Sequence, residues 1–227
     1  MRCSSIISAY FCKDWLHSRI TNLLDQTEVP RIVAVCQGNS EESKILAQFP
    51  EVLAIHTVDV PTVYEAWNMA LDAVTTPFIN IANSDDRLEN TALQEMCDEL
   101  EKDTSYGLAY SNCHVVYELN GDVIQELDWA EGDLLNGCFI GPSPVYRAEL
   151  HKLYGKYPTE YIVAGDYYMW LKFQHNGVKF LHIKKPLVRF WNRSHDPSIE
   201  NNLEFKKKNL LIWESAKIQE YWKNASH

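Results

Sequence analysis

Short apolar runs alternate with helical patterns in the first half of the chain, and this alternation constrains the fold more than any other feature. Each run is rich in apolar residues and is followed by polar turn residues; the runs are residues 4–10, 31–36, 52–58 and 78–82. Between them, apolar residues recur at helical spacing. Largely apolar strands that are joined by helices predict a mostly parallel sheet covered by helices on both faces.

The helices of this half are indicated by their inner faces and their starts. Helical spacing covers residues 14–26 and 41–48, and Thr62 with Glu65 forms a capping box that begins a third helix. A fourth helix has three residues on its inner face: Leu93, Cys97 and Leu100. Residues 1–105 therefore have the pattern of a nucleotide-binding α/β half.

The second half has a different pattern. Two β-type runs, residues 107–117 and 122–127, flank Asn120-Gly121, which predicts a hairpin. A strand-like run at 138–147 contains a loop, and a helix over 163–174 stops at Asn176-Gly177. We expect two short strands at 178–183 and 187–191, and then an amphipathic helix over 203–222 with Leu211, Ile218 and Trp222 on one side.

No linker rich in Pro, Gly or Ser separates the two halves. The sequence therefore predicts one domain over residues 1–227. Its expected parts are a nucleotide-binding half at 1–105, an acceptor-binding and catalytic half at 106–200 and a C-terminal helix at 201–227.

Composition and charge exclude several classes of protein. With 46% hydrophobic and 23% charged residues, the 227-residue chain is neither disordered nor fibrous. A net charge of −10 argues against nucleic-acid binding, which usually needs a basic surface. The six cysteines lack the spacing of a zinc site, so we expect reduced thiols. No apolar stretch suits a signal peptide or a transmembrane segment, which predicts a cytoplasmic protein and leaves peripheral contact with a membrane open.

Two adjacent carboxylates follow the strand expected at residues 78–82. Asp85 and Asp86 would lie at the carboxyl end of that strand, where open α/β sheets bind ligands. Neighbouring residues of an extended chain point in opposite directions, so one carboxylate can accept hydrogen bonds from a ribose while the other reaches a divalent cation. Mg²⁺ and Mn²⁺ prefer oxygen ligands, which substrate phosphates can complete. The alternative is a solvated turn that caps the next helix.

Two other polar positions are weaker signals. Asp166 begins the helix expected at 163–174, and stabilisation by the helix dipole is a sufficient structural reason for it. His195 lies in a polar loop after a strand, where most histidines bind nothing. Arg193 beside it could steady a diphosphate.

Taken together and in order, these motifs resemble family-two glycosyltransferases with the GT-A fold. Tyr64-Glu65-Ala66-Trp67-Asn68, and then Pro77 to Asp86, resemble that family's Y-D-A-x-N … N-S-D-D signature. Gly165-Asp166 through Trp170-Leu171-Lys172 resembles its E-D-x-x-x-W-L-R motif, and Arg193-x-His195-x-x-Ser198 is similar to its R-x-H-x-x-S. Leu24-Asp25-Gln26-Thr27 matches its L-x-Q-T. The resemblance spans roughly residues 4–200.

The resemblance implies a single GT-A domain with a Rossmann-like, mostly parallel central sheet flanked by helices, a smaller antiparallel element and a C-terminal helix. It implies an inverting enzyme of polysaccharide biosynthesis that moves a sugar from a nucleoside-diphosphate-sugar, UDP-sugar favoured, to a hydroxyl of a glycan or glycolipid. The expected cofactor is Mn²⁺ or Mg²⁺ on Asp86, with His195 as a further candidate ligand. Asp166 would be the general base that removes the acceptor proton.

The same resemblance assigns the remaining site residues. The nucleotide-sugar would contact Ser8, Ala9, Tyr10, Gln37, Asn68, Ser84, Asp85 and Arg193. The acceptor would contact Gly141, Pro142, Ser143 and Gly165. Three positions depart from the family pattern: no acid that could bind the base follows the second strand (Cys36 to Ser40), Ala9 replaces a proline, and Gly165 replaces a glutamate.

Two alternatives stay open. A sugar-phosphate nucleotidyltransferase shares the general fold, but it normally has a Gly-rich basic loop near the N-terminus, and none is present here. A non-catalytic module that binds nucleotide-sugars or glycans is disfavoured by the joint presence of Asp86, Asp166 and His195. The missing base-binding acid keeps that second alternative open.

Overall fold

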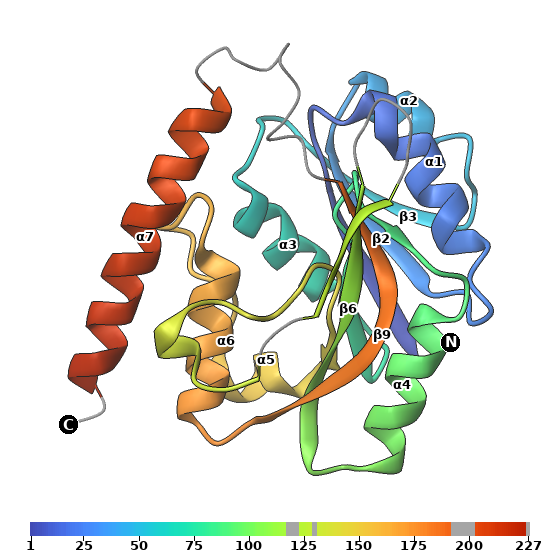
Figure 1. Ribbon diagram of the computed structural model, residues 1–227. Helices are drawn as coiled ribbons and strands as arrows, with labels where there is room; N and C mark the ends of the chain where they lie inside the picture. Colours follow the sequence, from blue (N-terminus) through green and yellow to red (C-terminus); the bar gives the residue numbers. More distant parts are fainter. Residues whose placement is uncertain (117–122, 129–130, 192–202, 226–227) are drawn as a thin grey trace.

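A computed structural model describes residues 1–116, 123–128, 131–191 and 203–225 of the chain (Figure 1). Within these ranges a single sheet has the strand order β3-β2-β1-β4-β8-β6-β9-β5, and β7 pairs with β6. Helices lie on both sides of this sheet, and a long C-terminal helix lies along one flank (Figure 1). The expected α/β architecture, including its C-terminal helix, is confirmed.

The first half of the chain forms the parallel part of the sheet. Its strands are β1 (Cys3–Ala9), β2 (Arg31–Gln37), β3 (Val52–Thr57) and β4 (Phe78–Ile81), each paired in parallel. The helices between them are α1 (Lys13–Leu24), α2 (Glu41–Leu46) and α3 (Val63–Asp72). The predicted capping box is confirmed, because Thr62 and Glu65 each accept a hydrogen bond from the other's backbone N–H. Since the strands share one direction, their carboxyl ends meet at one edge of the sheet.

The rest of the chain, from Arg87 on, adds strands of mixed direction, because most of the new pairings are antiparallel but the two longest strands pair in parallel. Its strands are β5 (Arg87–Leu88), β6 (Tyr106–Val116), β7 (Val123–Leu127), β8 (Val145–Arg147) and β9 (Lys179–Trp191). Its helices are α4 (Ala92–Lys102), η1 (Leu134–Asn136), α5 (Glu149–Tyr154), α6 (Gly165–His175) and α7 (Leu203–Ala225). The expected hairpin is confirmed by antiparallel pairing of β6 with β7, although Asn120-Gly121 lies outside the described residues.

Three sequence-based expectations for this half are corrected. The strand expected at 138–147 is only β8, because Pro142 and Pro144 lack the N–H that a ladder needs and Ser143 has a φ of 57°. The two strands expected at 178–183 and 187–191 are the single strand β9, which accommodates Pro186 through an irregular register opposite Asn112. In α7, Leu211 is exposed, while Ile218 and Trp222 are buried as expected.

Two apolar cores fill the two faces of the sheet. One lies under α1 and α4 and includes Leu16, Leu93 and Cys97. The other lies under α3, α5, α6 and α7 and is rich in aromatic rings, among them Tyr64 and Trp170. In Figure 1 these two groups of helices stand on opposite sides of the strands. The aromatic core matters for function because it packs around the start of α6, where Asp166 lies.

The cysteines and the helices can be described briefly. All six cysteines are free thiols, and only Cys138 is exposed. Within the described ranges, no helix has the length and apolar character needed to cross a membrane. The functional division at residues 105 and 200 stays a prediction, while α7 matches the expected C-terminal helix in position.

Candidate active site

The loops after β1 and β2 lie at the carboxyl edge of the parallel strands. The Tyr10 hydroxyl is 2.8 Å from Thr57 Oγ1 at the end of β3, and Gln37 Nε2 donates to the Val58 carbonyl at 2.9 Å. Ser8 and Tyr10 are half-buried and Ala9 is buried. The structure therefore gathers four of the residues expected to contact the nucleotide-sugar, Ser8, Ala9, Tyr10 and Gln37, at one edge.

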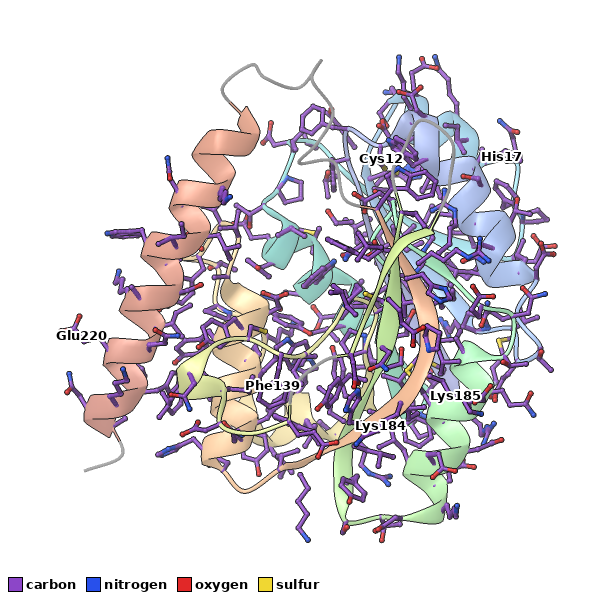
Figure 2. The ribbon with its side chains drawn as sticks, in the orientation of Figure 1. Cys12, His17, Phe139, Lys184, Lys185 and Glu220 are labelled. Carbon is purple, nitrogen blue, oxygen red and sulfur yellow. The ribbon has the colours of Figure 1, made fainter. Side chains whose placement is uncertain are left out.

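Phe11 is a residue of this edge that the sequence did not single out. Its side chain is 89% exposed and its φ is 54°, a left-handed conformation that a bulky residue rarely adopts. Such strain is common at binding sites. Cys12, which follows it, donates its backbone N–H to Glu42 at 3.0 Å and lies near the upper ends of the strands in Figure 2. Burial raises the pKa of the Cys12 thiol to about 12, so it is a packing residue and not a nucleophile.

Asp86 ends the loop that follows β4, directly before β5, and is 1% exposed. Asn83 Nδ2 donates to its Oδ2 at 2.9 Å, and the Trp191 backbone N–H at the end of β9 points to its Oδ1 at 3.4 Å. Burial, and then repulsion from Asp85, raise the pKa of Asp86 to about 6. Two crowded carboxylates, one of them buried, form a local excess of negative charge that a cation would relieve.

Two arginines lie near this carboxylate pair. Arg87 donates to the Ser84 and Asp86 carbonyls at 2.9 and 2.7 Å and to Trp15 in α1 at 3.2 Å, so it fixes the loop to that helix. Arg19 is fully buried in α1; burial lowers the pKa of its guanidinium to about 10, and the charge of nearby Asp86 partly opposes that fall. Apolar periodicity could not have identified Arg19, because it occupies a position on the buried face of the helix.

Asp166 lies in the first turn of α6 and faces the first turn of α3. Its Oδ1 accepts two hydrogen bonds, one from the backbone N–H of the next residue, Tyr167, at 2.8 Å and one from the Tyr64 hydroxyl at 3.2 Å. Burial raises the pKa of the Asp166 carboxyl, and these two donors partly oppose that rise. The side chain is thus held in one orientation, and its pKa is moved in the direction that a general base requires.

Gly165 has a clear steric reason in the structure. A Cβ atom at this position would lie 2.8 Å from Cε2 of Tyr64, the residue whose hydroxyl holds Asp166. The glutamate of the family pattern therefore has no room here while Tyr64 keeps its place. The predicted contact of Gly165 with an acceptor stays a prediction.

The loop of residues 138–144 connects the two carboxylate clusters. Cys138 is exposed as a residue, yet its sulfur lies deep enough for burial, and then the charge of nearby Asp166, to raise the pKa of the thiol. At the other end of the loop, the Ser143 carbonyl accepts from Asn80 in β4 at 3.0 Å. The six residues from 138 to 143 therefore run from the neighbourhood of Asp166 to β4, the strand that leads to Asp86.

Ser143 itself has two unusual features. Its φ is 57°, and its hydroxyl is buried with no hydrogen-bond partner among the described residues. An unsatisfied buried hydroxyl on a strained residue is rare in proteins and favours a ligand contact. Gly141 is buried and Pro142 half-buried in the same loop. The acceptor contact predicted for Gly141, Pro142 and Ser143 stays a prediction.

Asn68 and the nearby tyrosines have strong internal partners. Asn68 Nδ2 donates to the Tyr157 carbonyl at 2.8 Å, and the Tyr157 N–H donates to Asn68 Oδ1 at 2.9 Å. The side chain therefore pins the chain before α6, and its contact with a nucleotide stays a prediction. Tyr157, Tyr161 and Tyr167 are buried in the aromatic core, where they pack against other rings.

The third motif lies outside the described residues. Arg193 and His195 follow β9, whose last residue is Trp191, and no structure is described for residues 192–202. Among the described residues, no group of three His, Cys, Asp or Glu side chains could hold a metal ion. Asp85 and Asp86 are therefore the described candidates for oxygen ligands, with substrate phosphates completing the shell.

Comparison with known proteins points to one enzyme class. A scan against models of protein families finds no match. The chain is 25% identical over 230 residues to the UDP-Glc:alpha-D-GlcNAc-diphosphoundecaprenol beta-1,3-glucosyltransferase WfaP of Escherichia coli. That alignment covers 99% of this chain and 88% of WfaP.

Solved structures share the fold. TarS 1–349 of S. aureus in complex with UDP matches with a TM-score of 0.71 and 18% identity, over 93% of this chain and 70% of that one. The mannosyltransferase PcManGT of Pyrobaculum calidifontis, in complex with GDP-Man and Mn²⁺, matches with a TM-score of 0.66 and 13% identity, over 86% and 58%. The GT-A-like fold and the assignment to glycosyltransferases, both expected from sequence motifs, are confirmed by these comparisons.

Proposed function

From the premise that this chain is a GT-A-type glycosyltransferase, we propose that it transfers a sugar from a UDP-sugar to a hydroxyl of a lipid-linked glycan, with inversion at the anomeric carbon. Asp166 is the general base and Asp86 binds a divalent cation in this proposal. UDP is favoured because WfaP is a UDP-Glc-dependent glucosyltransferase and the TarS structure contains UDP. A lipid-linked acceptor is favoured because WfaP is described as acting on GlcNAc-diphosphoundecaprenol.

The observation that carries the proposal is the environment of Asp166. A carboxylate in the first turn of a helix would ordinarily be stabilised by the helix dipole and solvated. Here burial raises its pKa, while Tyr64 and the Tyr167 N–H hold one oxygen in place. A purely structural capping residue does not need the hydroxyl of a buried tyrosine from another helix. A general base does need a fixed orientation and a raised pKa.

The residues at the end of β4 fit a divalent cation. Asp85 and Asp86 offer carboxylate oxygens, the ligands that Mg²⁺ and Mn²⁺ prefer. The raised pKa of Asp86 reflects repulsion from Asp85 as well as burial, and a bound cation would remove that repulsion. A cation there supplies Lewis-acid stabilisation of the negative charge on the leaving diphosphate. Asp86 would be the direct ligand, and Asn83 would keep its carboxylate oriented.

The chain's own residues account for the remaining steps. Asp166 takes the proton of the acceptor hydroxyl as that oxygen forms its bond to the anomeric carbon. The bond from that carbon to the diphosphate oxygen breaks, and the nucleoside diphosphate leaves with the electron pair. Attack from the face opposite the leaving group inverts the anomeric configuration. Ser143, with its unsatisfied hydroxyl, would orient the acceptor or the transferred sugar.

An exposed apolar surface on α7 supports a lipid-linked acceptor. Leu211, Ile212 and Trp213 are 44%, 61% and 60% exposed, and Lys217 Nζ lies 5.2 Å from the Trp213 ring. Exposed apolar residues with a tryptophan and a lysine suit the interface of a membrane. Sedimentation with vesicles that contain anionic lipid tests this part of the proposal, and binding that survives replacement of Trp213 and Ile212 by serine would contradict it.

The test of the donor and metal assignment is a thermal-shift panel of nucleoside diphosphates, each with and without Mn²⁺. We expect UDP with Mn²⁺ to raise the melting temperature of the wild-type protein and to raise it much less in the Asp86→Asn variant. The matched control is Asp25→Asn, a change of the same kind at an exposed position at the far end of α1. Equal stabilisation of all three proteins by UDP with Mn²⁺ would exclude Asp86 as a ligand.

A further inference from the structure

Glu214 of α7 makes a set of contacts that no part of the proposed reaction has yet used. Its side chain is 2% exposed. Its Oε1 accepts from the Ile162 N–H at 2.8 Å, and its Oε2 accepts from the Val163 and Ala164 N–H groups at 3.0 and 2.9 Å. One buried carboxylate thus binds three consecutive backbone amides that lie about fifty residues earlier in the chain.

These three amides immediately precede α6. Ala164 is the residue before the helix and has no side chain that can cap it. The first backbone N–H groups of a helix have no partner inside the helix and carry partial positive charge. An acidic side chain normally caps them from the N-cap position itself. Ala164 supplies no such cap, and Glu214 of α7, which lies beside α6 (Figure 1), binds instead the three amides that lead into the helix, up to that of Ala164.

We propose that Glu214 is a positioning residue for the general base: by clamping residues 162–164, it fixes the first turn of α6 and therefore the place of Asp166. This inference rests on the proposed role of Asp166. The clamp is rigid because hydrogen bonds to a charged acceptor are about twice as strong as neutral ones. It also makes α7 part of the catalytic apparatus and not merely a terminal support.

The charge of Glu214 adds an electrostatic effect to the mechanical one. The groups that face Asp166 are Tyr64 from α3, Tyr157 from the segment before α6, Cys138 from the preceding loop and Glu214 from α7. Tyr64, Tyr157 and Cys138 have pKa values raised by burial and are neutral near pH 7. Glu214 is the carboxylate among these neighbours, and its charge contributes to the raised pKa of Asp166.

The test compares Glu214→Gln with Glu220→Gln in the full chain. Glu220 lies six residues further along α7 on its outer side, so the control removes the same charge from an exposed position (Figure 2). For Glu214→Gln we expect kcat to fall about 10- to 100-fold because a small displacement of a catalytic group has effects of that size, with the donor KM nearly unchanged. The acidic limb of the kcat–pH profile should move to lower pH, since a negative charge near Asp166 has been removed.

A second variant separates position from charge. Glu214→Asp keeps the charge but shortens the side chain, so kcat should fall while the acidic limb stays near its wild-type pH. Hydrogen exchange of the amides of residues 162–164 should be faster in both Glu214 variants and unchanged in Glu220→Gln. If Glu214→Gln does not fold, Glu214→Asp carries the test through kcat and the exchange rates.

Two results would overturn the inference about Glu214, and a third would overturn the proposed function instead. Faster exchange at 162–164 with kcat equal to that of Glu220→Gln would show that the clamp does not position the base. An acidic limb of Glu214→Gln at its wild-type pH would show that the charge does not act on Asp166. By contrast, full activity of Asp166→Asn would refute the proposed function itself, whatever the Glu214 variants do.

Discussion

Replacing Gly165 by alanine tests the geometry around Asp166 with a single methyl group. The added Cβ would lie 2.8, 2.9 and 3.0 Å from three ring atoms of Tyr64. That ring has little freedom to move, because it is 2% exposed and the Trp67 and Tyr157 rings lie 5.3 and 6.0 Å from its centre. Overpacking of this kind costs about 1–3 kcal/mol.

Whether Gly165→Ala raises or lowers the stability of the protein depends on this clash. Without a clash, Gly165→Ala at the start of a helix would stabilise the protein by about 0.4–1 kcal/mol, because alanine restricts the unfolded chain. With the clash, the free energy of unfolding should fall instead. For a chain of this size each kcal/mol corresponds to about 2–4 °C in melting temperature, which is readily measured by calorimetry. Transfer activity should fall as well, because displacement of Tyr64 loosens Asp166.

Two further proteins complete this experiment. Gly38→Ala is the control, because its Cβ would meet its nearest neighbour, the Thr57 carbonyl oxygen, at an ordinary 3.6 Å. In a Tyr64→Leu background, Gly165→Ala should cost less than in the wild-type protein, since the atoms that it strikes have been removed. A higher melting temperature for Gly165→Ala in the wild-type background would refute the packing described for Tyr64.

Three other variants test separate parts of the structure. Burial lowers the pKa of His151 to about 4. As the pH falls, the unfolded chain binds a proton at this histidine before the folded protein does, so the free energy of unfolding should fall by up to about 3 kcal/mol between pH 6.5 and pH 4. Urea titrations of His151→Gln should lack this part of the fall. Asn68→Ala leaves the buried N–H and C=O of Tyr157 unpaired and should cost about 1–3 kcal/mol in urea denaturation; an unchanged stability with weakened donor binding would favour the nucleotide contact instead. Tyr64→Phe removes a donor to Asp166 and should move the acidic limb of the transfer rate to higher pH, so a limb that stays in place counts against the hydrogen bond.

The parallel half of the fold was predictable because its signals are local. The runs at 31–36 and 78–82 are strands because they are apolar and bounded by turn residues, and Thr62 begins α3 through a capping box within four residues. In the second half the local signals misled. The two short strands expected at 178–183 and 187–191 left a gap that contains Pro186, whereas a register irregularity against β6 lets β9 continue through this proline.

The carboxylates of the site were predictable from their motifs, but their support was not. Asp86 and Asp166 each follow a recognisable pattern at the end of a strand or the start of a helix. Glu214 reaches residues 162–164 across about fifty residues, and no spacing in the sequence encodes such a contact. Arg19 lies on the apolar face of α1, where periodicity predicts an apolar residue. Charges that act through tertiary packing become visible only in the folded chain.

The central claim, that Asp166 is the base of a sugar transfer, is tested most directly by the Asp166→Asn variant. Hydrolysis of a UDP-sugar in the presence of Mn²⁺ requires no knowledge of the acceptor, since water takes its place. We expect the variant to release UDP at least about 100-fold more slowly than the wild-type protein, because a positioned base contributes about 10²–10⁴ in rate. Its affinity for UDP with Mn²⁺ should be nearly unchanged in calorimetric titration. Release of UDP at the wild-type rate would contradict the account.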